Sequence, residues 1–116
     1  MPHEVPASGY PPQVALFGEP TEASLEDWLQ ANLQTVLASL TGAAIDEVEI
    51  QDLGGRDAGY LRALHLGQDR HLLTEMWVWT APGVGWVLSA TVDLRDYVDY
   101  EEVFEEMAWS FDPDPP

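Results

Sequence analysis

Residues 72–79, which read LLTEMWVW, form the centre of the stretch that decides the fold, Gly54–Asp93. Both alternating registers of this run are apolar, with Leu72, Met76 and Val78 in one register and Leu73, Trp77 and Trp79 in the other. Successive side chains of a strand point to opposite faces of its sheet. The run therefore predicts a central strand with two apolar faces, each of which needs a cover.

Turn residues divide the surrounding stretch into further strands. We expect strands over residues 58–66, 71–81 and 86–92, joined by turns at residues 67–70 and 82–85. Each strand is rich in β-branched, aromatic or aliphatic residues, and each turn contains glycine, as is usual for hairpins. Consecutive strands with such short connections predict an antiparallel sheet.

The remaining elements follow from the hydrophobic period. Alternation predicts strands over 13–18 and 45–53, and helical spacing predicts helices over 25–40 and 97–111. Ser24 is expected to cap the first helix. The order strand, helix, four strands, helix predicts an α+β fold, a two-layer sandwich with both helices on one face of a mostly antiparallel sheet.

Composition indicates one domain with its own core. The chain has 116 residues, 46% of them hydrophobic, and no cysteine, which excludes disulfides and thiolate chemistry. We expect a flexible, proline-rich lead-in over residues 1–12, a single domain over 13–111 and a disordered acidic tail over 112–116.

The charge balance is strongly acidic. Twenty-one acidic residues against four arginines, with no lysine, give a formal net charge of −17. Proteins that bind nucleic acid or anionic membranes rely on Lys and Arg, so we expect neither partner. A basic partner or simple solubility both explain the charge.

The N-terminus lacks the features of a secretory signal. It has neither a basic segment nor an apolar segment, and no run approaches the roughly 20 apolar residues of a membrane span. We expect a cytoplasmic protein that does not insert into a membrane. An exported protein without its leader would have the same sequence.

Few residues suggest catalysis or metal binding. The serines lack a neighbouring base, no phosphate-binding glycine loop occurs, and the cluster of acids after Asp93 lacks a calcium-loop spacing. His65 and His71 flank a predicted hairpin and, with Asp69, offer at most a weak metal site. We expect no enzyme activity, no cofactor and no metal.

The tryptophans are the strongest indication of function. Trp77, Trp79 and Leu73 share one face of the central strand, and Trp86 lies on the next strand. If both helices cover the other face, this face is left for a partner: an apolar helix or peptide, or a second copy in a homodimer. Burial of the same side chains in the core is the alternative.

Several segments resemble the DcrB/LpqN group of the PsbP-like fold. The resemblance covers roughly residues 13–111 and is carried by degenerate patterns: Ser24-Leu25-Glu26-Asp27-Trp28 through Asn32-Leu33, Leu53-Gly54-Gly55-Arg56-Asp57-Ala58, Trp86-Val87-Leu88-Ser89-Ala90-Thr91, and Phe104, Met107 and Ser110-Phe111. The chain lacks the additional first strand or hairpin that members of the group usually have, and it lacks the export signal and lipidated cysteine of the group's lipoproteins.

The resemblance implies a non-enzymatic binding module. One branch with a similar design, the Eag chaperones of type VI secretion, shields apolar transmembrane helices of an effector before export. We therefore expect a chaperone or adaptor that binds a protein partner, or itself, through the tryptophan-rich face. An acidic inhibitor or immunity protein that neutralises a basic partner is the alternative, because of the net charge of −17.

Overall fold

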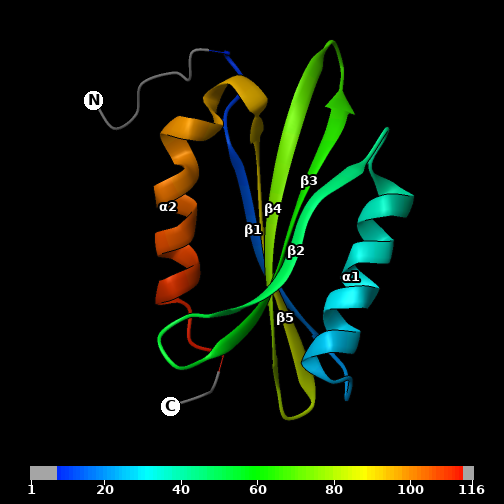
Figure 1. Ribbon diagram of the computed structural model, residues 1–116, viewed down its shortest axis with the longest axis vertical. Coiled ribbons are helices and arrows are strands. Elements are labelled where there is room, and N and C mark those ends of the chain that lie inside the picture. The colour runs from blue at the N-terminus through cyan, green and yellow to red at the C-terminus, as the bar shows by residue number, and fades with distance from the viewer. Residues whose placement is uncertain (1–7, 114–116) are drawn as a thin grey trace.

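The structure, a computed structural model, describes residues 8–113. It consists of one five-stranded sheet and two α-helices (Figure 1). The elements are β1 (Gln13–Pro20), α1 (Leu25–Ser39), β2 (Ala44–Asp52), β3 (Asp57–Gly67), β4 (Arg70–Ala81), β5 (Val84–Asp93), a short 3-10 turn (Leu94–Asp96) and α2 (Tyr97–Ser110). The predicted α+β class and element order are confirmed.

Every pair of neighbouring strands in the sheet is antiparallel. The order is β1-β5-β4-β3-β2, so β4 lies in the middle and β1 and β2 form the two edges. Three hairpins connect β2 through β5, as their short glycine-containing turns predict. Gly54 and Gly55, with φ of 71° and 88°, supply the left-handed backbone that the β2–β3 turn requires.

The two helices cover opposite faces of the sheet, which corrects the prediction that both lie on one face. Figure 1 shows the sheet between α2 and α1. The core accordingly has two parts. Phe104 and Ala108 of α2 pack with Trp77 and Trp79, whereas Trp28 and other residues of α1 pack with the opposite register.

Helix α1 is held against its face by apolar packing and one hydrogen bond. Ser24 caps the helix, accepting a hydrogen bond from the Asp27 amide at 3.2 Å. The Trp28 ring packs over Gly85, where a Cβ would overlap it, and its indole N–H donates to the Trp86 carbonyl at 3.1 Å. Trp28 is thus a core residue, as its helical position predicted.

Helix α2 begins directly after β5. The buried side chain of Asp93 accepts hydrogen bonds from the Arg95 amide and guanidinium at 2.8–3.2 Å and from Arg70 at 3.1 Å. The hydrogen bonds from the Arg95 side chain, followed by that from its backbone, lower the pKa of Asp93 to about 2. Asp93 therefore stays ionised at neutral pH and fixes the corner at which the chain leaves the sheet for α2.

Parts of the two terminal segments contact the domain. Ser8 hydrogen-bonds to the buried carboxylate of Asp96, and the Arg70 guanidinium lies 4.9 Å from the centre of the Tyr10 ring. At the other end, Asp112 lies 3.1 Å from the Arg56 guanidinium. The expected flexibility of residues 1–7 and disorder of residues 114–116 concern positions outside the described residues.

The packing of α2 on its face predicts a large effect of losing a central ring. Trp79→Ala is expected to lower the free energy of unfolding by about 3–5 kcal/mol, because the ring is 1% exposed and its removal leaves a cavity in the core. Denaturant titration followed by circular dichroism measures the change. Trp109→Ala, which removes a ring that is 56% exposed, is the control and should cost far less. Equal losses would contradict this packing.

Candidate functional site

The four residues expected to bind a partner lie beneath α2. Trp77, Trp79 and Leu73 are 2%, 1% and 3% exposed, and Trp86 is partly buried against the same cluster. Their face is apolar because α2 covers it, so in this structure they are core residues and are not exposed anchors. The alternation of residues identified the face correctly, but it carries no information about which helix lies on it.

Phe111, the residue directly after α2, packs against this cluster. Its ring centre lies 4.8 Å from that of Trp79 and 5.5 Å from that of Trp86. The two tryptophans face each other across β4 and β5 in the strand register. The segment after α2 therefore completes the cover over Trp79 that the helix begins, while Trp86 stays partly exposed.

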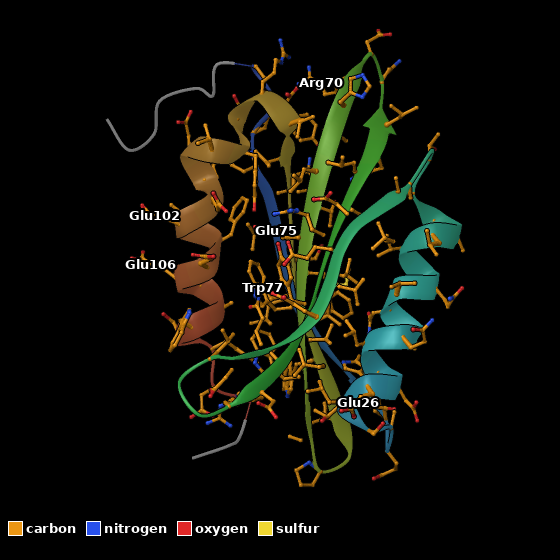
Figure 2. All side chains as sticks on the ribbon, in the orientation of Figure 1. Glu26, Arg70, Glu75, Trp77, Glu102 and Glu106 are labelled. Carbon is orange, nitrogen blue, oxygen red and sulfur yellow. The ribbon has the colours of Figure 1, made fainter. Side chains whose placement is uncertain are left out.

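A buried polar cluster interrupts the apolar face near the first turn of α2. Glu75 on β4 is 2% exposed and accepts hydrogen bonds from the hydroxyls of Tyr60 at 2.5 Å and Tyr97 at 2.7 Å. Its other oxygen, Oε1, has no hydrogen-bond partner among the described residues. Figure 2 shows Glu75 next to Trp77 on the side of the sheet that α2 covers. The sequence offered one sign of this cluster, an acidic residue within an apolar strand.

Arg62 connects the cluster to the edge of the sheet. Its guanidinium lies 3.5 Å from the Tyr97 hydroxyl, and it forms ion pairs with Asp46 at 2.5 Å and Glu47 at 3.2 Å. Arg62 pairs directly with Glu75 in the register of β3 and β4. The Arg62 guanidinium thus lies beside the buried Glu75 carboxyl group, but its ion pairs are with the two acids at the surface.

Burial dominates the titration of this cluster. It raises the pKa of Glu75 above its ordinary value, although the hydrogen bonds from Tyr60 and Tyr97 oppose the rise. Burial, followed by the hydrogen bond to Glu75, likewise raises the pKa of both tyrosine hydroxyls. The tyrosines therefore stay protonated and act as donors, and the cluster serves to fix α2 on the sheet.

An apolar groove lies between α2 and the edge strand β1. It encloses about 520 Å³ and is lined by Val14, Leu16, Leu88, Val103, Glu106, Met107, Ser110 and Phe111. Val14 and Leu16 point to the α2 side of β1, and the α2 residues recur at helical spacing along the facing side of the helix. The helix covers β5 and leaves β1 open. Residue patterns did not locate this groove, because they do not record which face of the sheet each helix covers.

The groove combines exposed apolar side chains with acidic residues. Leu16 is 49% exposed and Met107 39%, which is unusual for residues of this size that lie together. Glu106 lines the groove, and Glu102 lies one turn before it on α2 (Figure 2). The surface is thus suited to an apolar segment that carries positive charge.

His65 and His71 do not come together as a metal site. His65 pairs with Leu72, and His71 pairs with Leu66, so the two imidazoles lie on opposite faces of the hairpin. His65 is buried, and its Nε2 lies 2.8 Å from the Thr74 hydroxyl. Within residues 8–113, no group of three or more His, Asp or Glu side chains could hold a metal ion.

The raised pKa of Glu75 predicts a specific dependence of stability on pH. A folded-state pKa above the ordinary value of 4.5 means that the free energy of unfolding falls as the pH rises above about that value. In Glu75→Gln this loss should be absent. The free energy of unfolding of the wild type should therefore fall relative to that of the variant by at most about 1.4 kcal/mol per pH unit. Denaturant titrations between acidic and neutral pH measure it. Parallel curves for the two proteins would show that Glu75 does not take up a proton on folding.

The comparison with known proteins shows the fold. No family model matches the chain, and no curated protein matches it in sequence. The solved structure of PA94 from Pseudomonas aeruginosa, a protein of unknown function, is similar with a TM-score of 0.70 at 14% identity, covering 97% of this chain and 90% of that one. The cyanobacterial PsbP protein of Synechocystis is similar with a TM-score of 0.61 at 18% identity, covering 85% of this chain and 65% of that one.

At these identities the likeness concerns the fold and not the function. The membership in the DcrB/LpqN group that the sequence patterns suggest stays a prediction. Among residues 8–113, no helix is both long and apolar enough to cross a membrane. The chain has a PsbP-like fold, with a five-stranded antiparallel sheet between two helices.

Proposed function

We propose that this protein is a non-enzymatic binding module, a chaperone or adaptor whose partner is a protein with a basic, apolar segment. The groove between β1 and α2 carries this proposal. Four large apolar side chains that are 39–49% exposed gather there: Val14, Leu16, Val103 and Met107. An apolar surface of this kind with a polar rim is typical of a site for a protein segment.

Charge supports a basic partner over a second copy. A net charge of −17 makes two copies repel each other, whereas it attracts a basic segment. Glu106 lies within the groove itself, and α2 carries further acids at Asp99, Glu102 and Glu105. Self-association through the groove is therefore the less favoured outcome, although it makes use of the same apolar side chains.

The charge of the chain also favours a second candidate function, an acidic inhibitor that neutralises a basic protein. The two functions differ in their dependence on salt. Binding through the apolar groove persists at high ionic strength, because burial of apolar surface is not screened. Inhibition through acidic side chains would weaken steeply as salt is added.

Removing apolar surface from the groove tests the proposal without changing the charge. Leu16→Thr combined with Met107→Gln should weaken binding of short synthetic lysine–leucine peptides by about tenfold or more, since about 1.4 kcal/mol of apolar burial accounts for a factor of ten. Fluorescence anisotropy with labelled peptides measures the affinity. Peptides in which glutamate replaces lysine should bind more weakly, because the acidic side chains around the groove repel them.

The chain offers a matched control for this double variant. Val48→Thr with Val98→Gln also removes apolar surface from one edge strand and from α2, at positions that are 44% and 78% exposed and do not line the groove. These substitutions should leave the affinity unchanged. Equal weakening in both double variants, or none in either, would refute the groove as the binding site.

A further inference from the structure

The outer edge of β1 is free within the described residues. In the order β1-β5-β4-β3-β2, β1 pairs with β5 alone, so the N–H and C=O groups on its other side have no strand beside them. All eight residues of β1 are exposed. Such an edge can accept a further strand, from a second chain or from a peptide.

The two edges of the sheet differ in their protection against added strands. The edge strand β2 carries four acids, Asp46, Glu47, Glu49 and Asp52, and its pairing is interrupted by a register shift between Ile45 and Glu47. Both features oppose edge-to-edge pairing. The edge strand β1 has a single charged residue, Glu19, and pairs with β5 in continuous register from Gln13 to Pro20.

The free edge and the groove are adjacent because both belong to β1. Strands lie about 4.8 Å apart, so an added strand would run along the groove beside Val14 and Leu16. Every second side chain of that strand would point to the α2 side and enter the groove. The others would point to the opposite face of β1, which carries Phe17 and Glu19, where a lysine stem would cover the ring and its ammonium would approach the carboxylate. The acids of α2 would attract these lysines only at longer range, because they lie on the other face.

We propose that the partner segment binds as an extended strand that adds to the free edge of β1, with apolar side chains at alternate positions in the groove and basic side chains between them. This inference rests on the proposed function and specifies the conformation and sequence pattern of the segment. A helix in the groove would bury the apolar side chains equally well, but it would leave the N–H and C=O groups at the edge of β1 without partners.

Amide hydrogen exchange measured by NMR distinguishes the two modes. The probe is a short synthetic peptide of alternating lysine and leucine, compared with a peptide of the same composition in which the leucines follow helical spacing. Strand addition predicts that the alternating peptide binds at least about tenfold more tightly. It also predicts that exchange slows by about tenfold or more at every second amide of β1, those that do not donate to β5.

The edge strand β2 serves as the internal control, because its amides should exchange at unchanged rates. Two results would overturn the inference in different ways. If methyl signals of Leu16 and Met107 shift while the β1 amides stay unprotected, or if the helical peptide binds as tightly, the segment is not a strand, and the proposed function stands. If neither peptide binds, both the strand mode and the basic partner are wrong.

Discussion

The structure depends on the two apolar faces of β4, which lies at the centre of the sheet. Burial of Val78 requires a helix on one side, and burial of Trp77 and Trp79 requires one on the other. Each fully buried side chain of this size contributes about 1.5–3 kcal/mol, so leaving either face open would remove much of the stability of so small a domain. The chain meets this constraint by placing α1 after β1 and α2 after β5.

One helix on each face is too narrow to cover five strands. Helix α1 contacts β3 and β4, and α2 contacts β5, so the outer strands keep exposed apolar side chains. On the α2 side these residues form the groove beside β1. The buried hydrogen bonds among Glu75, Tyr60 and Tyr97 fix where α2 begins on the sheet, and they thereby set the position of the groove. The proposed binding surface thus follows from the limited cover that the core receives.

Much of the fold could be predicted from the sequence, whereas the site could not. Alternation and turn residues located the five strands, and helical spacing with Ser24 located α1, because these signals are local. The face on which each helix packs depends on the direction in which the chain leaves a strand, which residue patterns do not record. Without this direction, Trp77 and Trp79 were assigned to a face that no helix covers. The groove could not be located for the same reason, since it depends on where α2 lies on the sheet relative to β1.

In this structure α2 covers the tryptophan face and leaves the edge of β1 open. Relaxation of protein NMR signals by a paramagnetic agent dissolved in the solvent tests both parts in one measurement, because it reports how closely solvent approaches each proton. We expect weak relaxation of the indole N–H signals of Trp77 and Trp79, and strong relaxation of the methyl signals of Leu16 and Met107. Strong relaxation of the two indoles together with protected methyl groups would contradict this arrangement.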